Sequence, residues 1–141
     1  MLQPGDWLLL QNEINDIEAV LKEAGDRDVN VAFNVAPVDG REQNYCLDAV
    51  RLLIVNEVEA TALARKTVPD AALDALCGRF PTAHIVLTLG REGLLHGIGG
   101  HREKLAAYRV EAVDETAAGD AFVGYLMAGL LSGEELSLIH I

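Results

Sequence analysis

The sequence predicts an α/β fold in which a parallel sheet is flanked by helices in three layers. Short apolar runs alternate along the chain with segments whose apolar residues recur at helical spacing. Strands that alternate with helices pair in parallel through right-handed crossovers, which places the helices on the faces of the sheet. The chain has 141 residues and is 50% hydrophobic, so it can form one domain with a substantial core.

The first part of the chain predicts a strand followed by a helix. Residues 7–11 (WLLLQ) form an apolar run with the length of a strand that is buried on both faces. A helical pattern follows at 17–24, with Asn15 or Asp16 as its N-cap and Gly25 as its stop.

Two further strands and a helix are expected next. Residues 29–33 (VNVAF) and 49–55 are apolar runs of strand length. Pro37 and Gly40 mark the loop between them, because both residue types interrupt regular structure. Residues 57–65 form a helical pattern.

The second half of the chain is expected to add a helix, a hairpin and a long final helix. Pro69 opens a helical pattern that ends near Gly78. Residues 85–89 form a strand, and the GREG turn after them leads into another apolar run, which indicates a hairpin. The last two expected elements are a half-buried strand at 108–113 and a long helix at 116–131, which a loop of small residues opens.

Polar residues follow the carboxyl ends of the expected strands. In an open parallel sheet, ligands bind beyond these ends, so the polar residues mark the expected ligand edge. Loops are often polar by chance, which readily explains polar residues at one strand end. It explains polar residues at all five strand ends less well. The residues are Gln11, Glu13, Asn34, Asn56, Glu59, Thr88, Gly90 and the segment from Asp114 onward.

Charge and composition exclude several classes of protein. The formal net charge of −11 argues against nonspecific binding to nucleic acid or to an anionic membrane, which needs clustered Lys and Arg. No segment is apolar over a bilayer-spanning length, and the first residues do not resemble a signal peptide. Cys46 and Cys77 lack zinc-site spacing, so we expect two buried thiols in a soluble, cytoplasmic protein.

The segment 113–122 (VDETAAGDAF) carries the clearest sign of chemistry. Its small residues Ala117, Ala118 and Gly119 leave the backbone open just before a run of helix formers. A helix N-terminus binds anions through its free N–H groups, and small residues let a phosphate come close. Asp120 either caps this helix or acts as the general base for an attacking hydroxyl. The sequence contains no GxxxxGK[ST] motif, which excludes a P-loop enzyme.

This segment resembles the DTxGAGD signature of the ribokinase (PfkB) carbohydrate kinase family. Glu115 departs from the signature, since the family usually has Thr there. The QNEI and NVAP segments favour a ribokinase over a fructokinase or an adenosine kinase. The segments that resemble family motifs, in the family's order between about Leu8 and Leu131, are LLLQNEI at 8–14, NVAP at 34–37, NEVEA at 56–60 and TLGREG at 88–93.

The resemblance implies a ribokinase-like fold and roles for residues at the sugar and the migrating phosphate. Asp120 is implied as the catalytic base that takes a proton from the primary hydroxyl of the sugar. Glu13 is implied as a contact to sugar hydroxyls, a task that suits a carboxylate acceptor. Ala117, Ala118 and Gly119 are implied as the anion hole, and the last two also as nucleotide contacts.

The resemblance also implies nucleotide and metal contacts. Asn56 and Glu59 match the family's NxxE motif around phosphate and magnesium, where Glu59 would hold Mg²⁺ through water. Thr88, Gly90 and Gly93 match the nucleotide-binding turn. A K⁺ site beside the anion hole would include part of the segment that precedes it, namely Asp114 and Thr116.

Local structure offers a second explanation for several of these residues. Glu13 fits an exposed position at a strand end. Asn56 and Glu59 have the spacing of a capping box, which is compatible with a functional role. Gly90 and Gly93 suit a hairpin turn whether or not a nucleotide binds there.

The implied activity is ATP-dependent phosphorylation of D-ribose to ribose 5-phosphate, with Mg²⁺ accompanying ATP and K⁺ as an activating ion. Full-length relatives are expected to be homodimers. Three alternatives stay open: another sugar or nucleoside kinase of the family, such as a fructokinase; a non-catalytic nucleotide-binding module; and a structural α/β domain.

The resemblance covers only part of the family's domain. We expect residues 1–141 to be a partial carbohydrate kinase domain that lacks the N-terminal glycine-rich sugar segment and the small β lid. Residues 137–141 do not resemble the family's continuation and are expected to be a non-native tail. A sheet cut at one side exposes an edge, so we expect the isolated chain to have little activity and to self-associate.

Overall fold

The computed structural model describes residues 1–107 and 118–134 of the chain. Within these residues, six strands form one sheet, and their spatial order is their order along the chain. The first four strands pair in parallel, and the last two join in antiparallel orientation. The strands are β1 (Trp7–Gln11), β2 (Asn30–Asn34), β3 (Val50–Asn56), β4 (His84–Thr88), β5 (Leu94–Ile98) and β6 (His101–Leu105).

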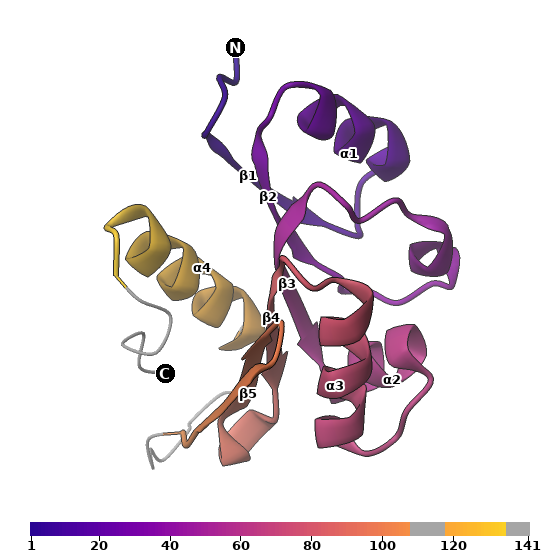
Figure 1. Cartoon of the computed structure of the whole chain (residues 1–141), viewed down its shortest axis with the longest axis vertical. Coiled ribbons are helices and arrows are strands. Elements are labelled where there is room, and N and C mark those ends of the chain that lie inside the picture. Colours follow the sequence, from indigo (N-terminus) through magenta and orange to yellow (C-terminus); the bar gives the residue numbers. More distant parts are fainter. Residues whose placement is uncertain (108–117, 135–141) are drawn as a thin grey trace.

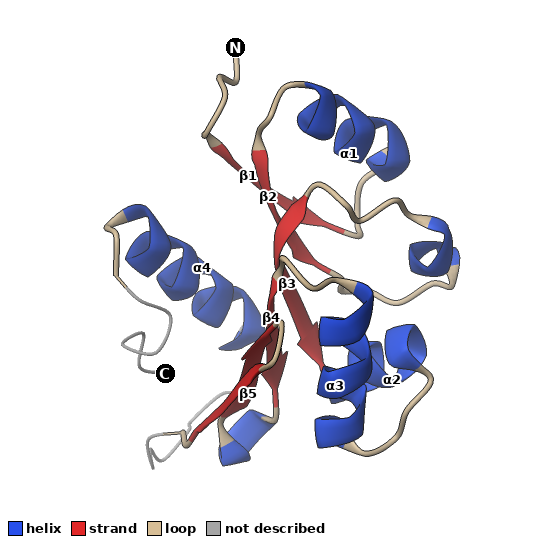
Figure 2. Cartoon of the chain, viewed as in Figure 1, coloured by secondary structure: helices blue, strands red, loops and turns tan. Residues whose placement is uncertain are grey.

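Helices cover both faces of the sheet. Three helices between the parallel strands lie on one face, and a fourth helix lies on the opposite face (Figure 1). Figure 2 shows the same three layers, with the strands in red between the helices in blue. This arrangement confirms the predicted three-layer α/β fold, in a mostly parallel form. The helices are α1 (Ile17–Asp26), α2 (Glu57–Ala64), α3 (Pro69–Arg79) and α4 (Ala118–Leu131).

The predicted elements agree with the observed ones to within about two residues at each described end. The sequence did not predict β6, because its residues (HREKL) are mostly charged or polar and mostly exposed. It also did not predict a short 3₁₀ helix at Arg41–Asn44. The strand expected at 108–113 lies outside the described residues.

The prediction of two buried thiols is half wrong. Cys77 is buried in α3, but Cys46 is exposed. Cys46 lies in the loop that leads to β3, and loops of this kind run over the surface.

Alternation along the strands divides the core into two clusters. On β2, Val31 and Phe33 face α1, α2 and α3, whereas Ala32 faces α4. The position of a residue along its strand therefore decides whether its side chain faces α4. The helix presents one apolar stripe to this face, formed by Phe122, Val123, Leu126 and Met127.

The turn between β4 and β5 packs tightly against the end of β6. Gly93 has φ of 102°, a backbone conformation that side chains rarely adopt. A Cβ atom at this position would lie 2.0 Å from the carbonyl oxygen of Leu105 and 2.7 Å from the backbone nitrogen of Ala107. The hairpin therefore requires glycine here for reasons that involve no ligand.

We expect Gly93→Ala to lower the free energy of unfolding by about 2–4 kcal/mol, because it combines backbone strain with a clash against backbone atoms. Urea unfolding followed by circular dichroism measures the change. Gly78→Ala is the matched control: it lies in α3 with open space around its Cβ position, and should stabilise the protein by about 0.5–1 kcal/mol. Equal stability of the Gly93→Ala variant and the unsubstituted protein would contradict the tight packing.

Two histidines form a stacked pair on the face that α4 covers. The Nδ1 atom of His84 lies 3.0 Å from Nε2 of His96, with the ring planes 11° apart. The Nδ1 atom of His96 is buried without a hydrogen-bond partner, since the nearest carboxylate oxygen, on Glu103, is 3.9 Å away. Burial lowers the pKa of both imidazoles, and the neighbouring His84 lowers the pKa of His96 further.

The histidine pair predicts a loss of stability in weak acid. Below pH of about 6.5 the unfolded histidines gain protons that the folded pair resists, so the free energy of unfolding should fall as pH decreases through 6.5. Urea unfolding at pH 7.5 and pH 5.5 measures this slope. The double variant His84→Gln/His96→Gln should show a smaller decrease over the same interval. An equal decrease in both proteins would assign the pH dependence to other groups.

Candidate active site

A row of polar residues ends the four parallel strands on the face that α4 covers. The residues are Gln11, Asn34, Asn56 and Thr88, the last residues of β1, β2, β3 and β4. Because side chains alternate along a strand, the last residues of β2, β3 and β4 share a face with Ala32, Ile54 and Val86, which pack under α4. The edge of the sheet and the start of α4 thus enclose a polar site.

A cleft of about 130 Å³ lies at this edge, between the strand ends and the first turn of α4. Ile54, Val55, Phe122 and Val123 contribute apolar walls. Of the residues to which the resemblance gave a role, the cleft brings together Asn56, Glu59, Thr88, Gly119 and Asp120. These five come from three separate segments of the chain.

The first turn of α4 can hold an anion. The helix begins at Ala118, so Asp120 is its third residue and does not act as its N-cap. The first N–H groups of a helix have no intrahelical partners, and the helix dipole places positive charge there. Gly119 and Asp120 are both exposed and line the cleft. A carboxylate therefore stands beside backbone donors that have no intrahelical partner, which suits a base next to a bound phosphate.

The capping box that the sequence indicates is present at the start of α2. The Oδ1 atom of Asn56 accepts a hydrogen bond from the backbone nitrogen of Glu59 at 2.9 Å. In return, Oε2 of Glu59 accepts from the backbone nitrogen of Asn56 at 2.8 Å, and Oε1 accepts from Nδ2 of Asn56 at 2.9 Å. The two residues therefore hold each other in place at the cleft.

Glu59 is the buried carboxylate of the cleft, with an exposed fraction of 5%. Burial raises the pKa of its carboxyl group, and the hydrogen bond from the backbone of Asn56 partly offsets that change. Each carboxylate oxygen accepts one bond from Asn56, so further lone pairs stay available. This donor set fits a water-mediated contact to Mg²⁺, which retains several of its waters in proteins.

The structure separates Thr88 from the two glycines that the resemblance groups with it. Thr88 lines the cleft, and its hydroxyl lies 3.5 Å from the carbonyl oxygen of Val55. Gly90 and Gly93 are not among the lining residues. Both have positive φ, and Gly93 packs against β6, so the hairpin accounts for them.

Of five other residues to which the resemblance gave a role, two do not line the cleft and three lie outside the described residues. Glu13 is exposed in the turn after β1 and does not line it. Ala118 is the first residue of α4 but is also absent from the lining. The remaining proposed residues, Asp114, Thr116 and Ala117, lie outside the described residues.

Asn34 also lines the cleft, although the family resemblance assigned it no role. The sequence placed it at a strand end. The alternation of side chains along β2 is the signal that assigns it to the face covered by α4. It shares its face with Ala32, two positions earlier on β2, and therefore faces α4.

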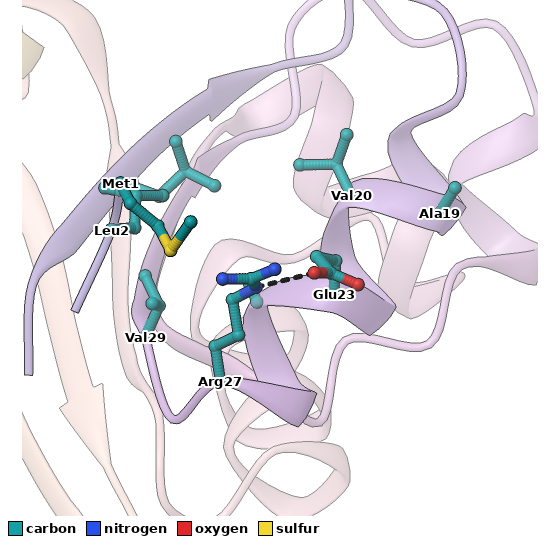
Figure 3. A pocket seen from close by; sticks show the side chains of 9 residues that line it. Met1, Leu2, Ala19, Val20, Glu23, Arg27 and Val29 are labelled. Atoms are coloured by element: carbon teal, nitrogen blue, oxygen red, sulfur yellow. Dashed lines mark hydrogen bonds and ion pairs between the residues drawn. The ribbon is translucent and has the colours of Figure 1, made fainter. Parts of the chain in front are cut away.

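A larger cavity, of about 400 Å³, lies between α1 and the start of the chain. Figure 3 shows its lining, in which the ion pair of Arg27 and Glu23 stands among apolar side chains such as Val20 and Val29. None of the residues proposed for catalysis or binding lines this cavity. Its size is therefore no guide to the chemistry of the protein.

The described residues hold neither a cluster of metal-ligating side chains nor a membrane-spanning helix. In residues 1–107 and 118–134, no group of three or more His, Cys, Asp or Glu side chains is placed to hold a metal ion. No helix in this part of the chain has the length and apolarity needed to cross a membrane.

We expect Asn56→Ala to lower the free energy of unfolding by about 1 kcal/mol, because it removes the N-cap of α2. Asn44→Ala is the matched control, since Asn44 is exposed and makes no side-chain hydrogen bond within the described part of the chain. Its stability should stay within about 0.5 kcal/mol of the unsubstituted protein. Thermal unfolding of both variants measures the difference. No loss in Asn56→Ala would show that α2 does not depend on its cap.

This chain resembles known proteins both in sequence and in fold. Residues 8–138 match the sequence profile described as pfkB family carbohydrate kinase. Ribokinase of Bacillus subtilis is 28% identical over 133 residues, which are 93% of this chain and 43% of that protein. Fructokinase of Escherichia coli is 36% identical over 92 residues, which are 65% of this chain and 29% of that protein.

A solved structure gives the same relation. Ribokinase from Cryptococcus neoformans in complex with ADP superposes with a TM-score of 0.81 at 28% identity, covering 94% of this chain and 50% of that one. The chain thus spans less than half the length of the curated relatives named above. With the profile match over nearly all of its residues, the chain belongs to the pfkB family of carbohydrate kinases.

Proposed function

We propose that this chain carries the phosphoryl-transfer part of an ATP-dependent kinase that converts D-ribose to ribose 5-phosphate, with Asp120 as the general base. The observation that carries the proposal is the position of Asp120 in the first turn of α4, in one cleft with Glu59 and Thr88. Phosphoryl transfer asks the protein mainly for positioning and charge stabilisation, and these elements offer both.

In the proposed reaction, the carboxylate of Asp120 accepts the proton of the primary hydroxyl of the sugar. The oxygen of that hydroxyl forms a bond to the γ-phosphorus of ATP while the bond to the β–γ bridging oxygen breaks. The electron pair of the broken bond leaves with ADP. The N–H groups at the start of α4, next to Gly119, stabilise the negative charge on the phosphoryl oxygens.

Each side of the cleft takes its own substrate in this proposal. Thr88, at the end of β4, belongs to the nucleotide side, and Asn56 also contacts the nucleotide phosphates. Glu13, beyond the end of β1, belongs to the sugar side, consistent with its place at the other end of the strand row. Gly90 and Gly93 shape the nucleotide turn through the hairpin.

Two metal ions complete the proposal. Mg²⁺ supplies positive charge to the ATP phosphates, and Glu59 holds it through water. An activating K⁺ ion is proposed at Asp114 and Thr116, beside an anion hole of Ala117, Ala118 and Gly119.

Fructose is the second candidate sugar. The Escherichia coli fructokinase is more identical to this chain than the ribokinase of Bacillus subtilis, although over a shorter segment. Ribose is favoured because the ribokinase match extends over most of the chain. We further propose that the full-length gene product is a cytoplasmic homodimer and that residues 1–141 form only part of its kinase domain.

The first test replaces the proposed base. We expect Asp120→Asn in the full-length gene product to lower kcat for ribose phosphorylation by about 10²–10⁴-fold, because an amide cannot accept the hydroxyl proton. A coupled assay of ADP release measures this, with fructose and adenosine as competing acceptors. Glu134→Gln, an exposed carboxylate beyond the end of α4, is the charge-matched control and should keep full activity.

Different outcomes reject different parts of the proposal. Turnover of fructose in place of ribose would keep the mechanism and replace the substrate. Full activity of Asp120→Asn would reject the base. Nucleotide binding with no turnover of any sugar would reject the kinase activity in favour of a non-catalytic nucleotide-binding module.

The second test concerns Glu59. We expect Glu59→Gln to raise the Mg²⁺ concentration that gives half-maximal activity by about tenfold, because an amide is a weaker partner than a carboxylate for the waters of a hard cation. Glu57→Gln is the control on the same helix turn, since Glu57 is exposed and does not line the cleft. Equal Mg²⁺ dependence in both variants would remove Glu59 from the proposed metal contact.

A further inference from the structure

Asn34 is a buried asparagine whose side chain has no hydrogen-bond partner among residues 1–107 and 118–134. Its exposed fraction is 8%, and no other described residue bonds to its amide. The other buried asparagine behaves differently. Nδ2 of Asn12 donates to the carbonyl oxygen of Pro37 at 2.6 Å, and Oδ1 of Asn12 accepts from the hydroxyl of Tyr45 at 2.9 Å. The amide of Asn34 has no such internal partner, and it lines the cleft, so it is available to a ligand there.

The amide of Asn34 faces the cleft. Alternation along β2 directs the side chain to the α4 face, and Asn34 is one of the residues that line the space under the first turn of α4. The group is therefore open to whatever occupies the cleft, while the rest of the residue is enclosed by protein.

The strand order gives Asn34 a middle position in the row. In the sheet, Asn34 pairs with Gln11 of β1 on one side and with Ile54 of β3 on the other. The proposed sugar contact, Glu13, follows β1, and the proposed nucleotide residues follow β3 and β4. A group that passes from nucleotide to sugar must cross the end of β2.

The charge of the cleft indicates what the amide would bind. The described lining includes the carboxylates Glu59 and Asp120 but no Lys or Arg. A phosphoryl group therefore depends on backbone N–H groups, a metal ion and neutral donors. Asn34 can supply two N–H donors, whereas Nδ2 of Asn56 already donates to Glu59.

We propose that Asn34 is a further catalytic residue, whose Nδ2–H group donates a hydrogen bond to a non-bridging oxygen of the phosphoryl group during its transfer. This inference rests on the proposed function, because it assigns a donor to the same reaction. Two independent observations carry it: the first turn of α4 on one side of the cleft and a buried, unpaired amide that faces it from the other. The bond strengthens as charge develops on the phosphoryl oxygens.

Asn34→Ala and Asn34→Asp in the full-length gene product test the inference. Loss of one such donor should lower kcat by about 10²–10³-fold in the Ala variant, with KM for sugar within about threefold and KM for ATP raised by about tenfold. The Asp variant should be slower still, because it places a third carboxylate against the phosphoryl group. Asn44→Ala and Asn44→Asp, at an exposed position outside the cleft, are the matched controls and should keep full activity.

A binding measurement makes the test independent of turnover. Calorimetry in the presence of Mg²⁺ should show that Asn34→Ala weakens binding of the β,γ-imido analogue of ATP by about tenfold. Binding of ADP should change less than twofold. The unfolding free energy of Asn34→Ala should not decrease, since no internal hydrogen bond is lost. A purely structural asparagine would give the opposite result: lower stability and an unchanged preference for the triphosphate.

The outcomes separate this inference from the proposed function. Unchanged kcat and an unchanged preference for the triphosphate would overturn the role of Asn34 while the sugar kinase proposal stands. A reduced preference for the triphosphate in a protein that phosphorylates no sugar would support Asn34 as a hydrogen-bond donor to the phosphate and reject the sugar kinase activity. Failure of the unsubstituted protein to bind either nucleotide would overturn both.

Discussion

The packing of α4 against one face of the sheet is the interaction on which the site depends. Its apolar stripe, centred on Phe122 and Leu126, covers strand residues such as Ile54. Burial of this stripe fixes the axis of the helix, and that axis points its N-terminal turn at the ends of β2, β3 and β4. The proposed chemistry at Asp120 therefore rests on hydrophobic contacts made within about two helical turns of it. A loss of packing at this interface would displace the first turn of α4, which we propose binds the phosphoryl group, without changing any polar group.

The sequence predicted the fold and the local part of the site well, since both depend on short-range patterns. The periodicity of apolar residues located the strands and helices, and the NxxE spacing located the capping box of Asn56 and Glu59. Long-range placement was less accessible. Nothing in the segment HREKL indicates a strand, because β6 exists only through its pairing with β5. The stacking of His84 on His96 likewise follows from the β4–β5 register, in which residues twelve positions apart become neighbours.

Asn34 and Gly93 show opposite limits of reasoning from motifs. The resemblance gave Gly93 a nucleotide role, yet the backbone of Leu105 leaves no room for a Cβ atom there, which explains the glycine through the hairpin alone. Asn34 received no role, yet it occupies the cleft. A motif records that a residue type recurs, whereas burial and hydrogen bonding decide what a residue does in one chain. That the amide of Asn34 lacks a hydrogen-bond partner among the described residues can be seen only in the structure.

The reciprocal hydrogen bonds at the start of α2 have a consequence for the kinetics of ligand capture. A long acidic side chain normally samples many rotamers, and freezing them costs about 1.5–2 kcal/mol. Glu59 has already lost that freedom when the helix forms, because Asn56 holds both of its oxygens. In the proposed reaction, a hydrated cation that arrives with the nucleotide thus meets a carboxylate in a fixed orientation. The side chain of Glu59 does not have to change rotamer when the cation binds, because its orientation is already set when α2 folds.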